Sequence, residues 1–325
     1  MTSTLDGAIP LPTHAWFPDE TLYSICSRHH RLCDHQRVSE TCNELAGMTR
    51  QDSAHNLPSG VQVLVSRTAG RLGTVDDIIR RRTILSFYLP FLDEPGEADV
   101  LRAASHGSVR ELRDSLGLAK SIFRANPPLK ACEICMGLDL ERFGVAYWHL
   151  KHQIPGVSYC IDHEVMLGAW HPSRSEGHGY QWILPSRLAV DFGAHRDSTW
   201  LRAILLDVSK AAIGVSTLVH RERLDATRLG ATYAARLDSR GLVHRKSRLL
   251  RRSAIGSEFA QYLANLSGVV DFHPLEPGES AAVSHVVRLL RTPQPLHPLW
   301  HVPCIAWLFE SWPEFLQAYT ESDRY

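Results

Sequence analysis

The sequence is short of several features that whole classes of protein need. It carries 35 Lys and Arg against 35 Asp and Glu, so its formal net charge is zero with histidine neutral. A chain without net charge does not coat nucleic acid as a polycation does, and any DNA contact must come from a local patch. No run approaches the ~20 apolar residues that a membrane-spanning helix needs. Residues 1–10 lack the basic and apolar regions of a secretory signal.

Cysteine is also scarce. The seven cysteines are an odd number, and three of them fall within residues 132–160 instead of being spread as a disulfide framework would be. A reducing cytoplasm, with some cysteines binding a metal, is the better interpretation. The phosphate-binding pattern Gly-x4-Gly-Lys-Ser/Thr is missing from the sequence, so we do not expect the chain to be an ATPase. We expect a cytoplasmic protein with no membrane partner.

What is present indicates an ordinary globular chain with more than one domain. Its 325 residues are about twice the ~150 that one compact domain usually takes. Hydrophobic residues make up 44% of the chain, which is enough for a substantial core and excludes a disordered tail protein. The 18 histidines are many for this length, and histidine is the most versatile ligand, base and proton switch near neutral pH.

Helical periodicity is clear at both ends of the chain and weak in the middle. The first helix is expected to begin at Pro18-Asp19-Glu20, with Asp19 as its cap. Thr74 is expected to cap another helix, and a break is expected at Gly107. We expect the acidic stretch 93–99 to be a solvated loop. Helical signal returns with a cap at Ser198, and the last helix is expected over Trp300–Tyr319.

The pattern therefore predicts a mainly α, multi-domain protein. An N-terminal helical domain is expected over residues 1–125, a small metal-binding module over 126–175, and a C-terminal helical domain over 176–325. The middle segment begins at Asn126-Pro127-Pro128 and is rich in Cys, His, Gly and aromatic residues. It has too little periodic apolar content to fold unaided, so a bound ion is expected to stabilise it.

Four residues with metal-ligand spacing are the strongest local signal. Cys132-x2-Cys135 is followed by Cys160-x2-His163. Two such turns, each supplying two soft or borderline ligands, are the usual way to build a structural zinc site. Three thiolates and one imidazole leave no open position for water. The prediction is one structural Zn²⁺ bound by a CCCH set, without a catalytic role.

These cysteines allow two interpretations other than a metal site. A reactive Cys-x-x-Cys pair should open a helix in a βαβ context, and no strand is expected before Cys132. The cysteines could also be buried core thiols, which is our interpretation of the remaining four, Cys26, Cys33, Cys42 and Cys304. His149 and His152 could share one helix face as a second metal site or acid–base pair, but local hydrogen bonding is the simpler interpretation.

A basic stretch lies in the C-terminal half. Between Arg240 and Arg252 there are six basic residues and no acidic one. The six are Arg240, Arg245, Lys246, Arg248, Arg251 and Arg252. Flanking apolar residues predict a helix, a glycine-containing turn and a basic second helix, which is the arrangement of a DNA-binding helix-turn-helix. The alternative is a solvated helix face or an anchor for an acidic partner. Arg80-Arg81-Arg82 is treated as solvated.

Two motifs together resemble the TniQ/TnsD family of transposition proteins. The resemblance rests on Trp16-x-Pro18-Asp19-Glu20-Thr21-Leu22-Tyr23-Ser24-x3-Arg28, and on Cys132-x2-Cys135 followed by Gly144-x2-Tyr147-Trp148-His149-x2-His152-Gln153-x-Pro155-Gly156-Val157-x2-Cys160-x2-His163-x3-Leu167. A Cys-x-x-Cys pair alone would be weak support, whereas this combined spacing is specific. The motifs span roughly residues 11–170.

The resemblance implies a target-selection adaptor for a transposon, and not the transposase. Family members link a target to an AAA+ ATPase regulator of the TnsC/TniB type, either by binding double-stranded DNA or by joining a Cascade-type CRISPR RNA complex. The family also implies helix-turn-helix elements in both helical domains, a bacterial protein that works on the nucleoid, and by analogy a homodimer. Some RNA-guided members carry further cysteine pairs, but this chain has only Cys304 beyond residue 160.

The sequence allows three candidate functions. The first is the adaptor, which has no catalytic residues. The second is a stand-alone sequence-specific DNA-binding protein that recognises an attachment site or regulates transcription. The third is a metal-dependent hydrolase or nuclease that uses His149, His152 and His171, and it is the weakest. The sequence favours the adaptor, with Cys132, Cys135, Cys160 and His163 as the metal ligands.

Overall fold

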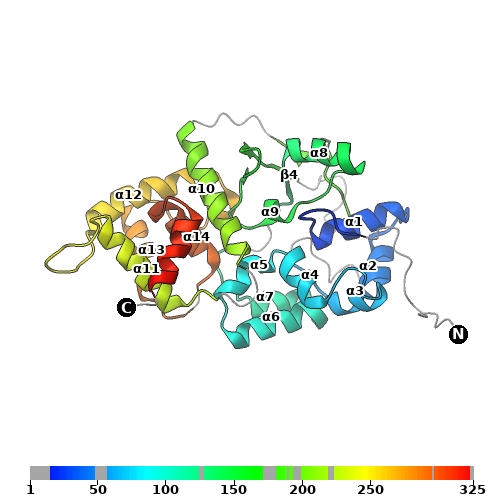
Figure 1. The fold of residues 1–325 in the computed structure, drawn as a ribbon, viewed down its shortest axis with the longest axis horizontal. Coiled ribbons are helices and arrows are strands. Elements are labelled where there is room, and N and C mark those ends of the chain that lie inside the picture. The colour runs from blue at the N-terminus through cyan, green and yellow to red at the C-terminus, as the bar shows by residue number, and fades with distance from the viewer. Residues whose placement is uncertain are drawn as a thin grey trace.

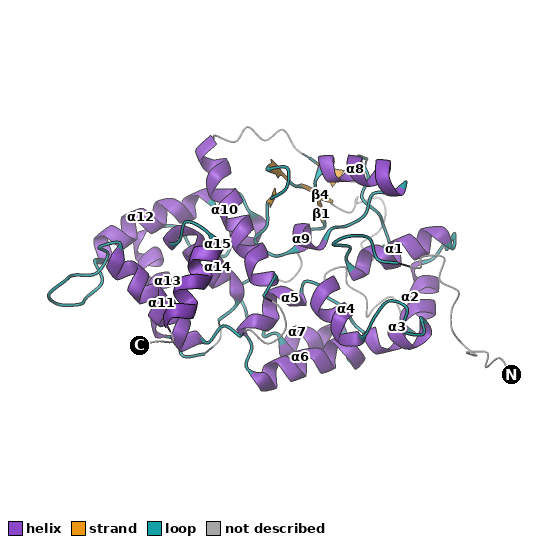
Figure 2. Cartoon of the chain, viewed as in Figure 1, coloured by secondary structure: helices purple, strands orange, loops and turns teal. Residues whose placement is uncertain are grey.

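The structure of the protein is a computed structural model. The description is of residues 15–47, 57–123, 128–170, 181–188, 190–192, 199–218, 223–294 and 296–322. Within these ranges the chain is mainly α-helical, as predicted, with two small antiparallel sheets in its middle part (Figures 1 and 2). No helix in the same ranges combines the length and the apolar character that crossing a bilayer requires.

Short helices make up the N-terminal part, at the lower right of Figure 1. They are α1 (Leu22–Leu32), α2 (Val38–Ala46), α3 (Val61–Arg67), α4 (Val75–Arg82), α5 (Leu85–Tyr88), the 3-10 turn η2 (Leu89–Phe91), α6 (Glu94–His106) and α7 (Val109–Ser115). Thr74 caps α4 by accepting a hydrogen bond from the Asp77 backbone N–H, and Gly107 separates α6 from α7. Both predictions are confirmed.

Two predictions about this part were wrong. Helix α1 is capped by Thr21 and not by Asp19, which has a positive φ of 55° and lies before the helix. The acidic stretch 93–99 is not a loop, because Asp93 caps α6 and accepts a hydrogen bond from the Gly96 backbone N–H. Glu97 then forms ion pairs with Arg80 and Arg223 from other parts of the chain.

The middle part combines small strands with two helices. Its elements are β1 (Lys130–Ala131), α8 (Glu133–Phe143), α9 (Leu150–Gln153), β2 (Tyr159–Cys160), β3 (Val165–Met166), β4 (Gly168–Trp170) and β5 (Val190–Asp191). Strand β4 pairs with β1 and β5, and β2 pairs with β3, all antiparallel. Helix α8 escaped the sequence analysis because its apolar residues Ile134, Leu138 and Leu140 are exposed and mark no buried stripe.

The C-terminal part is helical again. It contains α10 (Thr199–Ser216), α11 (Ala226–Ser239), α12 (Arg252–Asn265), the 3-10 turn η4 (Val270–Phe272), α13 (Glu279–Arg291), α14 (Pro298–Leu308) and α15 (Trp312–Glu321). Helix α12 packs on α13, and α10 packs on α14. The predicted last helix is two helices, since Phe309 ends α14 in an extended conformation and Ser311 caps α15. The cap expected at Ser198 lies outside the described residues.

The middle part contacts both helical parts. A connected cluster of buried apolar side chains includes Phe87, Tyr159 and Phe259, one from each of the three predicted regions. The Ser209 hydroxyl of α10 accepts hydrogen bonds from the backbone N–H groups of Ser158 and Tyr159, at 3.1 and 3.2 Å. The predicted domain boundaries stay predictions, but the apolar core is continuous across them.

A buried ion pair fixes the segment that precedes α1. Arg28 donates two hydrogen bonds to the two carboxylate oxygens of Glu20, each at 2.7 Å. The Glu20 side chain is fully buried and that of Arg28 is 7% exposed. The Arg28 guanidinium also lies 3.7 Å from the centre of the Phe17 ring. This bidentate geometry is strong, but it leaves a buried, unpaired charge if either partner is removed.

We expect Arg28→Ala to lower the free energy of unfolding by about 3–5 kcal/mol, because Glu20 would then be buried without its partner. Urea denaturation followed by circular dichroism measures the change. The matched control is Arg102→Ala, which removes an ion pair with Asp99 whose side chains are 68% and 61% exposed and should change stability by less than about 0.5 kcal/mol. Equal losses in the two variants would contradict the prediction.

Two histidines are buried in the C-terminal core. His285 donates to the Trp300 carbonyl oxygen at 2.7 Å, and the Tyr233 hydroxyl lies 3.0 Å from His301 Nδ1. Burial lowers the pKa of His285 to about 4 and that of His301 to about 3. Both rings are therefore neutral in the folded protein, whereas in the unfolded chain they bind protons below about pH 6.5.

Stability should consequently fall as the pH is lowered below about 6.5, because the unfolded state then binds more protons than the folded state. Each histidine contributes a loss of about 1 kcal/mol per pH unit. In His301→Gln, whose amide oxygen can still accept from Tyr233, the slope between pH 6 and 5 should be shallower than in the wild type by that amount. Urea unfolding at several pH values tests this, and parallel slopes would exclude the effect.

Candidate metal centre

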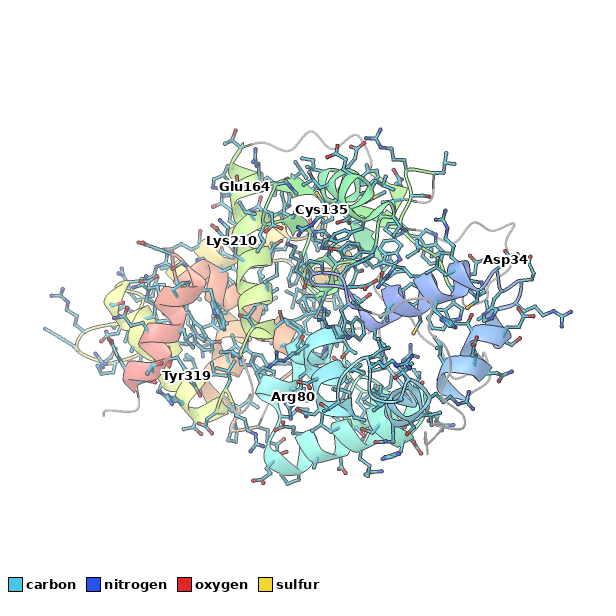
Figure 3. All side chains as sticks on the ribbon, turned by 45° about the vertical axis from the view of Figure 1, so that its right-hand side comes forward. Asp34, Arg80, Cys135, Glu164, Lys210 and Tyr319 are labelled. Atoms are coloured by element: carbon cyan, nitrogen blue, oxygen red, sulfur yellow. The ribbon has the colours of Figure 1, made fainter. Side chains whose placement is uncertain are left out.

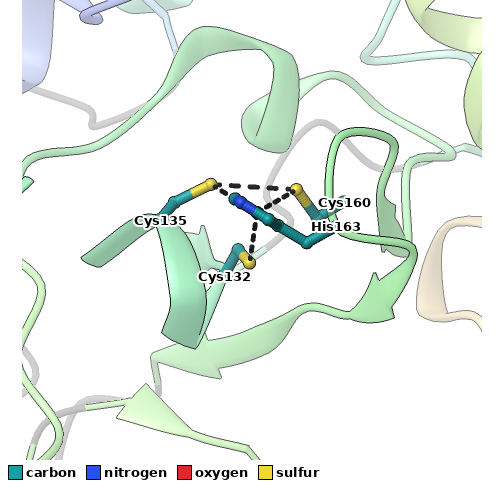
Figure 4. Close-up of side chains that lie close together, drawn as sticks. All are labelled: Cys132, Cys135, Cys160 and His163. Carbon is teal, nitrogen blue, oxygen red and sulfur yellow. Dashed lines mark hydrogen bonds between the residues drawn. The ribbon is translucent and has the colours of Figure 1, made fainter. Parts of the chain in front are cut away.

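The four predicted ligands come from two turns that face each other. Cys132 occupies the N-cap position of α8, and Cys135 lies in the first turn of that helix. Cys160 ends β2, and His163 lies in the turn to β3, which Glu164 closes with a positive φ of 50°. Figure 4 shows the three sulfur atoms grouped around one edge of the His163 ring. All four predicted residues are brought together.

The distances between the ligand atoms fit a tetrahedral ion. The Nδ1 atom of His163 lies 3.5, 3.3 and 3.5 Å from the Sγ atoms of Cys132, Cys135 and Cys160. The Sγ atoms of Cys135 and Cys160 are 3.8 Å apart. A zinc ion with bonds of ~2.3 Å to sulfur and ~2.05 Å to nitrogen gives edges of about 3.8 Å between sulfurs and about 3.6 Å between sulfur and nitrogen. The cage could hold a metal ion of this size.

Burial and crowding make the thiols suited to a cation. Cys132 and Cys160 are fully buried and Cys135 is 5% exposed. The pKa of Cys135 is raised, because its thiol is hydrogen-bonded to two neighbouring sulfurs and a second thiolate beside them would be repelled. A divalent ion removes this penalty by replacing the shared protons. Since four protein ligands complete the tetrahedron, the arrangement leaves no position for a reacting water.

The neighbouring histidines form local hydrogen bonds, as predicted. His152 Nε2 lies 3.9 Å from the Cys135 sulfur, and burial lowers the pKa of His152, so it stays neutral. His149 Nε2 lies 2.9 Å from the Asp139 carboxylate. His152 can therefore donate to a ligating thiolate from outside the first coordination sphere. His171, the third residue of the hydrolase hypothesis, lies outside the described residues.

The two sequence motifs are in direct contact. The Thr21 backbone N–H donates to the Trp148 carbonyl oxygen at 3.0 Å, and the Trp148 N–H donates to the Ser24 hydroxyl at 3.1 Å. Glu20 and His149 form an antiparallel bridge, and the Leu150 N–H donates to the Asp19 carbonyl oxygen at 2.7 Å. The start of α1 is thus joined to the backbone between the two ligand pairs.

The Gln-x-Pro-Gly stretch also has a structural role. The side chain of Gln153 accepts from the Lys130 N–H at 3.0 Å and donates to the Lys130 carbonyl oxygen at 2.8 Å, which holds β1 beside α9. Gly156 has a φ of 86°, and a Cβ there would lie 3.1 Å from the Phe272 ring. Its N–H donates to Asp271 at 2.8 Å. Sequence analysis missed Asp271 and Ser209, because nothing near them indicates a contact with the metal-binding module.

The basic stretch does not form the predicted second helix. Residues 240–251 lie between α11 and α12 as a hairpin loop, closed by an antiparallel bridge between Val243 and Leu250. The loop projects from the left end of the molecule in Figure 1. Gly241 and Arg248 have φ values of 71° and 57°, which no helix accommodates. Only Arg252 is helical, as the first residue of α12.

The six basic residues divide into two groups. Arg240 pairs with Glu258 and lies over the Trp307 ring, Arg248 pairs with Asp238, and Arg251 donates to the Gly241 carbonyl oxygen. The remaining three are exposed and have no side-chain partner among the residues that the structure describes, namely Arg245, Lys246 and Arg252. Three cations therefore hold the hairpin, and three are available to a ligand.

We expect Cys132→Ser to lower the zinc content of the purified protein by one equivalent and to loosen the middle part, because a structural zinc site loses most of its affinity with one ligand. Elemental analysis and near-ultraviolet circular dichroism measure the two effects. Cys304→Ser is the matched control, since Cys304 is equally buried at 1% exposure but lies in α14. Zinc lost equally from both variants would point to general unfolding instead.

Comparison with known proteins agrees with this geometry. Residues 12–167 match the family model described as TniQ. Over 153 residues, the chain is also 23% identical to the transposon Tn7 transposition protein TnsD of Escherichia coli. These residues make up 46% of this chain and 30% of that protein. The match thus spans less than a third of the relative's length. The family model covers the N-terminal motif and the metal cage, so residues 12–167 of the chain are a region of the TniQ family.

Proposed function

We propose that this protein is an adaptor that selects the target of a transposon. In this role it binds double-stranded DNA and recruits an AAA+ ATPase regulator of the TnsC/TniB type, which in turn engages the transposase. The observation that carries the proposal is the closed Cys3His cage joined to the first helix, within a match to transposition proteins over residues 12–167. A closed cage supports a non-catalytic role, because it offers no site for a metal-bound nucleophile.

The basic hairpin is the proposed DNA contact. A two-stranded ribbon has the width that the major groove admits, and its exposed Arg245 and Lys246 can reach phosphates on either side. Arg252 lies at the N-terminus of α12, where the helix dipole repels a cation. A phosphate bound there would relieve this repulsion, which supports a role in anion binding.

The way in which the hairpin contacts DNA distinguishes the adaptor from the stand-alone DNA-binding protein. Its exposed side chains include the cations Arg245 and Lys246, and Leu249 is 66% exposed. Cations that contact phosphates position a protein on DNA without reading sequence, whereas cations that contact guanine in the major groove read it. We propose the first, an adaptor that holds DNA while another component, such as a Cascade-type RNA complex, supplies the choice of site. We propose that it acts on the bacterial nucleoid, and that it can do so as a homodimer.

We expect the variant Arg245→Ala/Lys246→Ala/Arg252→Ala to bind random duplex more weakly than the wild type. Each phosphate contact contributes about −0.9 to the slope of log K against log salt, so the slope should become shallower by up to about three. Fluorescence anisotropy of a labelled duplex between 50 and 300 mM salt measures this. The control is Arg110→Ala/Arg113→Ala/Lys120→Ala, which removes three exposed cations from another surface.

The outcomes distinguish the two functions. Equal weakening in both triple variants would show that net charge alone matters and would remove the hairpin from the proposal. Tight, salt-resistant binding of one duplex sequence would favour the stand-alone reader. Co-elution of a purified AAA+ regulator of the TnsC/TniB type with the wild type and with the hairpin variant, on a gel-filtration column, would support the adaptor. Absence of any such complex would contradict it.

A further inference from the structure

A second group of metal-ligating side chains lies far from the Cys3His cage. His29, His35 and Glu44 each place one ligand atom within 4.8 Å of the others, and Cys33 adjoins them. They come from α1, the turn after it, and α2. In Figure 3, Asp34 of that turn lies at the right-hand edge of the molecule, well away from Cys135 of the cage. Nothing in the proposed function makes use of these four side chains.

Their distances are close to those around a tetrahedral ion. Oε2 of Glu44 lies 3.1 Å from His29 Nε2 and 3.2 Å from His35 Nε2. Ligand bonds of ~2.0–2.1 Å give nitrogen–oxygen edges of about 3.3 Å. The Cys33 sulfur lies 3.6 Å from His29 Nε2 and 3.8 Å from His29 Nδ1, so it packs beside the His29 ring and does not join the ligand group. The two nitrogen–oxygen edges fit one ion held by His29, His35 and Glu44 without a rearrangement of the helices.

The local sequence explains why these residues meet. His29 and Cys33 are separated by four positions, which places them on one face of α1 and its C-cap. Asp34 has a φ of 53°, a left-handed conformation that Asp tolerates better than most residues, and this turns the chain back so that His35 faces α1. Glu44 then reaches the group from the C-terminal half of α2.

A supporting hydrogen bond holds one ligand in place. Thr41 Oγ1 lies 2.8 Å from His35 Nδ1 and 2.6 Å from His30 Nδ1. A hydroxyl accepts from one ring and donates to the other. When it accepts from His35 Nδ1–H, the lone pair of His35 Nε2 points to the position that an ion would take. Metal-bound histidines are commonly oriented by a donor–acceptor pair of this kind on their second nitrogen.

We propose that His29, His35 and Glu44 form a second metal site, which takes a borderline divalent cation of the zinc class. Two imidazoles and one carboxylate are ligands that Zn²⁺ accepts, and three protein ligands leave a fourth position for water. His29 is 1% exposed, whereas His35 and Glu44 are 19% and 29% exposed, so an ion can enter from solvent. The ion would join α1 to α2, and α1 also carries Arg28, which pairs with the buried Glu20.

The test measures metal stoichiometry on the full chain. The protein is stripped with a chelator, reloaded with excess ZnCl2, freed of unbound metal on a desalting column and analysed for zinc per chain. We expect about two ions in the wild type and about one in His35→Gln and in Glu44→Gln, since each loses one ligand of the second site. His30→Gln is the matched control, because His30 bonds to the same Thr41 hydroxyl but is not a ligand, and it should keep two.

Affinity and thermal stability provide independent measurements. In zinc titrations, Glu44→Gln should bind the second equivalent at least about tenfold more weakly than the wild type, because loss of a ligand should exceed loss of an outer hydrogen bond. The melting temperature should rise on adding the second equivalent to the wild type, and it should not rise for Glu44→Gln. The comparison with Glu44→Gln remains valid even if His35→Gln fails to fold, because Glu44 is partly exposed and an amide has the same shape as the carboxylate.

Three results would overturn the proposal. One ion per chain in the wild type under zinc excess would show that the group is a hydrogen-bonded cluster. Two ions in both His35→Gln and Glu44→Gln would place the second ion elsewhere. Equal zinc loss in His30→Gln would mean that the segment, and not its ligands, sets the stoichiometry. None of these outcomes depends on DNA binding, so failure here leaves the proposed function standing.

Discussion

The structure depends on bringing three thiols and one imidazole to a single point. The ligand atoms all lie within 4.8 Å of one another, and the Cys135 and Cys160 sulfurs are 3.8 Å apart, a spacing at which thiolates repel unless a cation lies between them. The strands of this module are only two or three residues long, so they cannot form an independent sheet. A small buried cluster that includes Leu129, Met136 and Trp148 supplies part of the core of this module, and contacts with its neighbours supply the rest. An ion held by the four residues would add to its stability.

Those contacts explain why the two sequence motifs lie so far apart yet act together. The bridge between Glu20 and His149 makes the segment before α1 an edge of the metal module. The Arg28 side chain of α1 forms an ion pair with Glu20, so the buried charge of the first motif is neutralised where that motif contacts the second. On the other side, Ser209 and Asp271 accept backbone hydrogen bonds from the same module. Loss of the cage should therefore destabilise both helical parts.

Sequence reasoning found the features that depend on neighbours along the chain. The ligand spacing of the cage, the cap at Thr74 and the break at Gly107 follow from local rules. It did not predict elements whose contact partner lies far along the chain, or a helix whose apolar residues are exposed. The acidic stretch became helical because Asp93 caps it and Arg223 pairs with Glu97. Helix α8 leaves Leu138 and Leu140 in solvent, so no periodic pattern revealed it.

The basic hairpin shows how a chain without net charge can still carry a local excess of positive charge. Surface charges act over about one Debye length, ~8 Å at physiological salt, so a local excess matters more than the sum. Arg240 donates hydrogen bonds to Trp307 and Glu258, and Arg251 donates one to Gly241. These contacts anchor the two ends of the hairpin, and Arg245 and Lys246 are exposed between them. Side chains that already hold a loop in place lower the entropy that the binding of any ligand to that loop must overcome.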